Sequence, residues 1–179
     1  MIILKGANEN VIWLFSKSTN NQELYFTFLL LILNSKSQFM NTDPVIVERI
    51  LDAPAKKVWE ALTDNDQMRK WYFDISSFKP QLGFEFQFGG GSEEQTYVHL
   101  CKITEIVPEE KLKYSWRYAN FPGNSLVTFE LFSEGDKTRI KVTHEGLETF
   151  PQGRVFSKES FTSGWNQIIG KNLKDFVER

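Results

Sequence analysis

The sequence predicts an α+β fold in which a curved antiparallel sheet wraps around one long C-terminal helix. Three observations lead to this prediction. Residues 157–179 repeat apolar side chains at helical spacing. Between residues 84 and 145, runs with period-two alternation are separated by short turns. Ahead of them, one β-rich run precedes two short amphipathic segments. Helices gathered on one face of an antiparallel sheet form a two-layer domain.

The first elements are a strand and two short helices. Residues 45–51, VIVERIL, are rich in β-branched side chains and predict a strand with one exposed face. Asp52 near an N-cap and Pro54 in a first turn then predict a helix start. Asp64 begins a second helix, with Gln67 three residues later at capping-box spacing.

Five strands are expected to follow. In residues 84–88 every second side chain is Phe, and further strands are predicted at 97–107, 111–118, 125–132 and 137–145. The links between these later strands are too short for a parallel crossover, so neighbouring strands should be antiparallel. The glycine-rich stretch 89–92 matches no nucleotide-binding spacing and predicts a flexible turn.

The apolar residues of the last stretch form one helical stripe, which must be buried. They are Phe161, Trp165, Ile168, Ile169, Leu173 and Phe176. Gly164 and Gly170 interrupt the helix at a cost of about 1 kcal/mol each relative to Ala. Either glycine could bring the helix close to a ligand or close to the sheet, and the sequence leaves both open.

Residues 1–39 differ in composition and are treated as an N-terminal extension, with the domain at 40–179. Their apolar block at 24–33 is too short to cross a bilayer. One interpretation is a secretion signal or a peripheral anchor. The favoured one is an over-extended reading frame whose natural start is Met40.

Bulk properties restrict the partners. The formal net charge is -2 and the pI about 5.8, without a basic block, which argues against nucleic acid. No apolar run is long enough for a membrane span. The lone cysteine, Cys101, is expected to be buried and inert, as in a cytoplasmic protein.

Four successive blocks of the chain resemble one family, the activator of heat-shock-protein-90 ATPase homologue-like family of the START-like (SRPBCC) superfamily. The blocks are VERILDAPAKKVWEALTDNDQMRKWY, CKITEIVPEEKLKYSW, RIKVTHEGLE and SGWNQIIGKNLKDFVE. The resemblance covers roughly residues 45–178. It implies a helix-grip fold with a hydrophobic cavity between the sheet and the C-terminal helix. Residues 1–39 are too short to supply the separate N-terminal domain of the eukaryotic co-chaperone.

Superfamily members bind lipids, polyketides, sterols or hormones, and a few catalyse cyclisation or dehydration. We therefore expect a non-catalytic domain that binds a hydrophobic, lipid-like small molecule. The alternatives are a chaperone-associated interaction module, or a cyclase or dehydratase that uses His144 with a nearby Tyr. An open cavity would favour the first or third function, and a filled core with an exposed apolar patch the second.

Eight residues are predicted to line the cavity. They are Trp71, Phe86, Trp116, Phe129, His144, Phe161, Trp165 and Ile169. His144 shares the apolar face of its strand, where it could contact a ligand or be held by a backbone carbonyl, and the second interpretation is favoured. His99 is a weaker candidate. Neither histidine belongs to a metal or nucleophile motif, so no metal, cofactor or catalytic residue is predicted.

Overall fold

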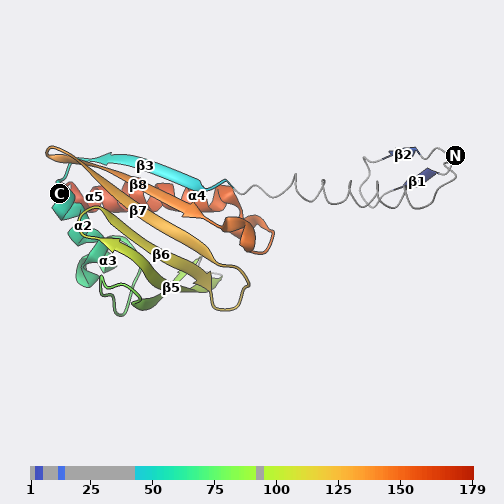
Figure 1. Ribbon diagram of the computed structural model, residues 1–179, viewed down its shortest axis with the longest axis horizontal. Coiled ribbons are helices and arrows are strands. Elements are labelled where there is room, and N and C mark those ends of the chain that lie inside the picture. Colours follow the sequence, from blue (N-terminus) through green and yellow to red (C-terminus); the bar gives the residue numbers. More distant parts are fainter. Residues whose placement is uncertain (1–2, 6–11, 15–42, 92–94) are drawn as a thin grey trace. The chain divides into compact units, whose positions relative to one another are not determined.

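The computed structural model describes residues 3–5, 12–14, 43–91 and 95–179 (Figure 1). The chain divides into two units, Met1–Asn41 and Thr42–Arg179. In the first unit, β1 (Ile3–Lys5) and β2 (Ile12–Leu14) pair antiparallel. The apolar block predicted at 24–33 lies outside the described residues.

The second unit is built on a six-stranded antiparallel sheet with the order β3-β8-β7-β6-β5-β4. Its strands are β3 (Val45–Leu51), β4 (Glu85–Gly91), β5 (Thr96–Val107), β6 (Lys111–Tyr118), β7 (Ser125–Glu134) and β8 (Lys137–Glu145). The first strand of the domain thus pairs with the last. A register shift in β5, between Ile103 and Glu105, adds a bulge that increases the local twist.

Two short helices follow β3: α2 (Ala55–Thr63) and α3 (Asn65–Trp71). As predicted, Asp64 caps α3, and its side chain accepts a 2.9 Å hydrogen bond from the Gln67 N–H. The predicted role of Asp52 is wrong. Pro54 occupies the N-cap of α2 without a side-chain bond, and the Asp52 carboxylate instead pairs with Lys137 on β8.

The C-terminal helix lies along one face of the sheet (Figure 1). Its segments are α4 (Lys158–Gln167), a π-helical turn η3 (Ile168–Leu173) and α5 (Lys174–Val177), preceded by the 3-10 turns η1 (Leu147–Thr149) and η2 (Arg154–Phe156). Ser157 caps α4 by accepting from the Ser160 N–H.

The π-helical turn is the main departure from the predicted regular helix. The fully buried residues of this helix are spaced four apart: Trp165, Ile169, Leu173 and Val177. A four-residue repeat drifts around a helix of 3.6 residues per turn. The wider π turn absorbs that drift and keeps the buried stripe against the sheet.

The glycine-rich stretch was predicted as a turn, but Gly89, Gly90 and Gly91 belong to β4 and pair with β5. The reason is close packing. A Cβ at Gly90 would lie 3.0 Å from the His99 ring and 3.1 Å from the Phe73 ring. Glycine therefore lets two aromatic rings approach the strand.

Candidate functional site: a cleft between the sheet and the C-terminal helix

A cleft of about 490 Å³ lies between the inner face of β4, β5 and β6 and the C-terminal helix. The strands and the segment after α3 form one wall, and η2, α4 and η3 form the other. Its described lining residues are Tyr72, Phe73, Gly90, Gly91, Tyr97, His99, Trp116, Tyr118, Val155, Ser160, Phe161, Gly164, Trp165, Gln167, Ile168 and Asn172. This volume is in the range of small-molecule sites.

The sheet wall of the cleft is a network of aromatic rings centred on His99. The imidazole stacks on Phe88 with centroids 4.5 Å apart and meets the Trp116 ring edge-on at 4.7 Å. Its Nδ1 lies 3.3 Å from the Phe88 carbonyl oxygen. Burial lowers the pKa of His99 to about 4, and the ring is therefore neutral at pH 7.

Among the described residues that line the cleft, none carries a formal charge at neutral pH. The lining contains no Asp, Glu, Lys or Arg. Burial raises the pKa of Tyr118 to about 12 and that of Tyr72 well above its usual value. The Tyr72 hydroxyl lies 3.0 Å from the Tyr114 hydroxyl, which accounts for one of its polar bonds. The cleft is thus an uncharged, aromatic site with a few neutral polar groups.

The indole N–H of Trp116 is buried and makes no hydrogen bond to any described residue. The Tyr118 hydroxyl lies near this N–H. The N–H lowers the pKa of Tyr118 and so opposes the larger effect of burial, which raises it. The two groups nevertheless lack hydrogen-bond geometry. Buried indole donors normally have a partner, so an unpaired one in a cleft wall needs an explanation.

His144 belongs to a chain of hydrogen bonds behind the cleft. The Trp165 indole N–H donates to His144 Nδ1 at 3.0 Å. Because an indole only donates, the imidazole proton is on Nε2, which donates to Ser125 Oγ at 2.8 Å. Ser125 in turn donates to the Trp116 carbonyl oxygen at 3.1 Å. This chain links the helix to three strands and fixes the orientation of Trp165.

Both ring nitrogens of His144 are therefore used, and the side chain is fully buried. Burial lowers the pKa of His144 to about 3. The ring has no free nitrogen, and it contacts lining residues such as Trp165 and Phe161 from behind without lining the cleft itself. This geometry supports a positioning role and gives no support to acid–base catalysis by His144.

The helix wall of the cleft is open at one position and polar at another. A Cβ at Gly164 would meet no heavy atom within 4 Å, whereas one at Gly170 would lie 3.0 Å from Nε of Arg49, on β3. Gly164 thus leaves space in the cleft, and Gly170 allows close packing against the sheet. About one helical turn after Gly164, the Gln167 side chain donates from Nε2 to Asn172 Oδ1 at 2.9 Å. These residues are five apart, the spacing of a π turn.

The structure brings three of the eight predicted cavity residues to the cleft: Trp116, Phe161 and Trp165. The other five lie in the surrounding core and are absent from the described lining. They are Trp71, Phe86, Phe129, His144 and Ile169. Trp71, for example, donates its indole N–H to the Ala61 carbonyl oxygen and joins α3 to α2. Ligand contact by any of the eight stays a prediction.

Several lining residues escaped the sequence prediction. Tyr97 and Tyr118 point inward in the period-two pattern of β5 and β6, so alternation would have found them. His99, which was predicted only as a weaker candidate, points the same way. Tyr72, Phe73 and Val155 lie outside the strands, where no periodicity predicts orientation.

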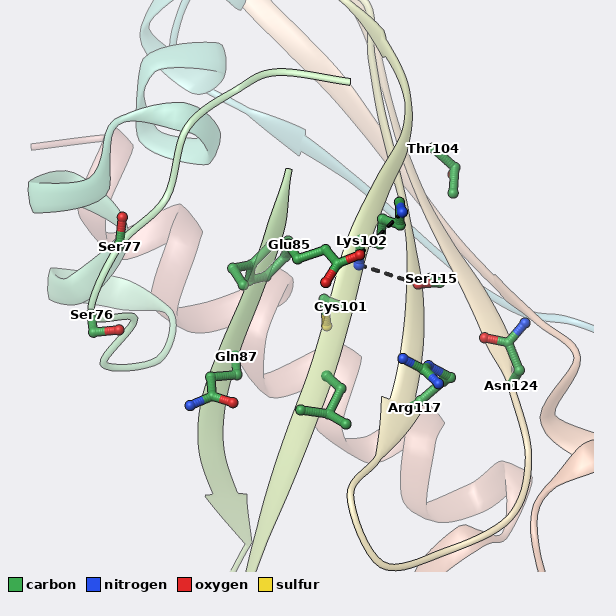
Figure 2. Close-up of a pocket in the computed structure, with 12 residues that line it drawn as sticks. Ser76, Ser77, Glu85, Gln87, Cys101, Lys102, Thr104, Ser115, Arg117 and Asn124 are labelled. Carbon is green, nitrogen blue, oxygen red and sulfur yellow. Dashed lines mark hydrogen bonds and ion pairs between the residues drawn. The ribbon is translucent and has the colours of Figure 1, made fainter. Parts of the chain in front are cut away.

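A second hollow of about 730 Å³ lies on the opposite face of β4–β6 (Figure 2). Glu85, Gln87, Lys102 and Arg117 point into it, and all four side chains are exposed. Lys102 and Glu85 form an ion pair of 3.1 Å across it. Although larger, this hollow is a solvated, charged surface, so the inner cleft is the better candidate for an apolar ligand.

The described residues contain no cluster of His, Cys, Asp or Glu that could hold a metal ion. Within the same residues, no helix has the length and apolar character needed to cross a membrane. Cys101 is buried as expected, and burial raises the pKa of its thiol.

Comparisons with known proteins agree with this fold. The family model described as Activator of Hsp90 ATPase homolog 1-like protein matches residues 52–178. The chain is similar to protein CV1439 from Chromobacterium violaceum, with 22% identity, a TM-score of 0.67, and coverage of 76% of this chain and 98% of that one. Protein MLL2253 from Mesorhizobium loti has 24% identity and a TM-score of 0.62, with coverage of 76% of this chain and 97% of that one. CalU16 from Micromonospora echinospora has 24% identity and a TM-score of 0.58, with coverage of 74% of this chain and 72% of that one. A search of curated proteins gave no match.

Proposed function

Because the chain belongs to the family of Activator of Hsp90 ATPase homolog 1-like proteins and has its helix-grip fold, we propose that it binds a hydrophobic small molecule in the inner cleft. The observation that carries this proposal is the cleft of about 490 Å³, whose described lining is rich in aromatic rings and contains no formally charged residue. The function is binding without catalysis.

The energetics of the cleft support this proposal. Burying apolar surface contributes about 25 cal/mol per Å², so a ligand that buries about 250 Å² gains about 6 kcal/mol. Loss of translational and rotational freedom offsets part of this gain. Rings held by mutual contacts, such as His99 on Phe88, do not need to become ordered on binding.

The two alternative functions are less well supported. A cyclase or dehydratase that depends on His144 would need a free ring nitrogen at the cleft, and both nitrogens are occupied. A chaperone partner stays a prediction, since no described contact tests it. An open cavity was expected to favour ligand binding or catalysis over an interaction module, and the cleft of about 490 Å³ supports the proposal in this respect. The expected cytoplasmic location also stays a prediction.

A titration tests the proposal directly. The probe is 9-anthracenemethanol, a planar, neutral, fluorescent molecule, added to the full chain while binding is followed by calorimetry and by quenching of tryptophan fluorescence. We expect saturable binding of one probe per chain with a micromolar Kd. Absence of saturable binding would overturn the proposal.

Two variants of α4 locate the binding site. Gly164→Leu places a branched side chain in the open part of the cleft, where a Cβ meets no atom within 4 Å. Ser163→Leu introduces the same side chain at the neighbouring residue, which is exposed and outside the cleft lining. We expect Gly164→Leu to abolish binding and Ser163→Leu to retain it. Equal binding by both variants would place the probe elsewhere.

A further inference from the structure

The chemistry of the cleft restricts its ligand further, and this inference rests on the proposed function. The described lining residues include no cation that could neutralise an acidic head group. The imidazole of His99 is also unprotonated at pH 7, because burial lowers its pKa to about 4. Burying a carboxylate without a partner is far more costly than burying a neutral group of the same size.

The polar end of the cleft is an amide pair. Gln167 Nε2 donates to Asn172 Oδ1, and both residues line the cleft. The bond uses one donor of Gln167 and one acceptor site of Asn172. Gln167 Oε1 therefore remains an acceptor, and donors remain on Asn172 Nδ2 and on the second N–H of Gln167 Nε2.

This pair matches a group that both donates and accepts. A hydroxyl or a primary amide could donate to Gln167 Oε1 and accept from Asn172 Nδ2. A carboxylate only accepts, so it could use the remaining N–H groups but would leave Gln167 Oε1 without a donor. The π turn sets this arrangement, because it brings residues five apart onto the same face.

We propose that the cleft selects uncharged ligands with a planar apolar body and a hydroxyl or amide end, which docks on Gln167 and Asn172, and that it rejects carboxylates. The ligand class is thus a neutral amphipathic alcohol or amide, and fatty-acid anions are excluded. The apolar body lies along the rings of the sheet wall, and the polar end faces the helix.

Three probes with the same ring system test this selectivity: 9-anthracenemethanol, 9-anthracenecarboxamide and 9-anthracenecarboxylate. At pH 7 the alcohol and the amide should bind with similar Kd, and the carboxylate at least about tenfold more weakly, because its charge is unpaired. Calorimetry at one temperature and ionic strength measures all three.

A charge variant should reverse the preference. Gln167→Lys replaces an exposed amide of the cleft lining with a cation. We expect it to improve carboxylate binding by at least about tenfold relative to alcohol binding, since an ion pair replaces an unpaired charge. Ser163→Lys is the matched control, because it adds the same charge to the same helix at an exposed position outside the cleft. Its selectivity should equal that of the unsubstituted chain.

The outcomes separate the two proposals. Binding of the carboxylate as tight as that of the alcohol, with unchanged preference in Gln167→Lys, would overturn the selectivity and leave ligand binding standing. The same shift in Ser163→Lys as in Gln167→Lys would also overturn it, because a general charge effect would then explain the preference. Failure of all three probes to bind would overturn the proposed function itself.

Discussion

Acidification from pH 7 to pH 5 should destabilise the protein through its two histidines. The sequence contains only His99 and His144, and both are buried. Burial is the main cause that lowers their pKa values, to about 4 and about 3. In the unfolded chain each imidazole titrates near its ordinary pKa of about 6.5.

These pKa values determine whether acidification raises or lowers the free energy of unfolding. Between about pH 4 and pH 6.5 the unfolded chain binds protons that the folded chain does not, so the free energy of unfolding decreases as the pH decreases. Each pKa unit of difference corresponds to about 1.4 kcal/mol. Integration from pH 7 to pH 5 gives a loss of about 2 kcal/mol per histidine, or about 4 kcal/mol for the pair.

Urea unfolding at pH 7, 6 and 5 measures this loss for the unsubstituted chain, His99→Phe, His144→Gln and the double variant. The relevant quantity is the change between pH 7 and pH 5 within each variant, so a pH-independent cost of the substitution cancels. We expect losses of about 4, 2, 2 and close to 0 kcal/mol in that order. Carboxylates titrate mostly below this range.

A double variant that loses as much stability as the unsubstituted chain would refute the reasoning. In that case other groups would cause the pH dependence, and the burial of the two imidazoles would not hold them neutral.

Three further predictions concern stability and reactivity. Ser125→Ala removes the hydroxyl that accepts from His144, and it should cost about 1–3 kcal/mol in urea unfolding. The exposed control Ser133→Ala should cost less than about 0.5 kcal/mol, and equal costs would contradict the hydrogen-bond chain. Gly164→Ala should stabilise by about 1 kcal/mol, because its Cβ has space in a helix. Gly123→Ala should destabilise, because its φ is +113° and its Cβ would collide with the Phe150 ring, and thermal unfolding that ranks the two glycine variants in reverse would disprove this account. The Cys101 thiol, whose pKa burial raises, should react with a disulfide reagent at pH 8 only in urea, and fast reaction of the folded chain would be inconsistent with its burial.

Much of the fold was predictable because burial alternates along most of the strands of this sheet. The structure confirms the predicted bounds of β3, β6 and β8, where inward and outward side chains alternate. The predictions failed where a residue's role depends on a distant neighbour. Gly90 lies in a glycine-rich stretch that is typical of a turn, but the His99 and Phe73 rings pack on it and it belongs to a strand.

The candidate site was less predictable for the same reason. His99 and His144 both lie on inward faces of strands, so the alternation of side chains predicts both of them equally well as cavity residues. Strand order does not separate them either, because β5 and β8 are each second from an edge of the sheet. The C-terminal helix makes the difference: Trp165 of α4 covers His144 and donates to its Nδ1, whereas His99 lines the cleft. The π turn that joins Gln167 to Asn172 likewise depends on how the helix packs on the sheet.

The central claim is that a ligand occupies the inner cleft, whose sheet wall includes Trp116. The most direct measurement is a ¹H–¹⁵N spectrum of the tryptophan indole groups during titration with 9-anthracenemethanol. Trp116→Phe assigns the Trp116 signal, and Trp59, which is outside the cleft lining, serves as the internal control. We predict a large, saturable shift of the Trp116 signal, a smaller shift for Trp165 and none for Trp59. Unchanged indole signals with shifts confined to backbone amides of Lys102 and Arg117, around the outer hollow, would contradict the account.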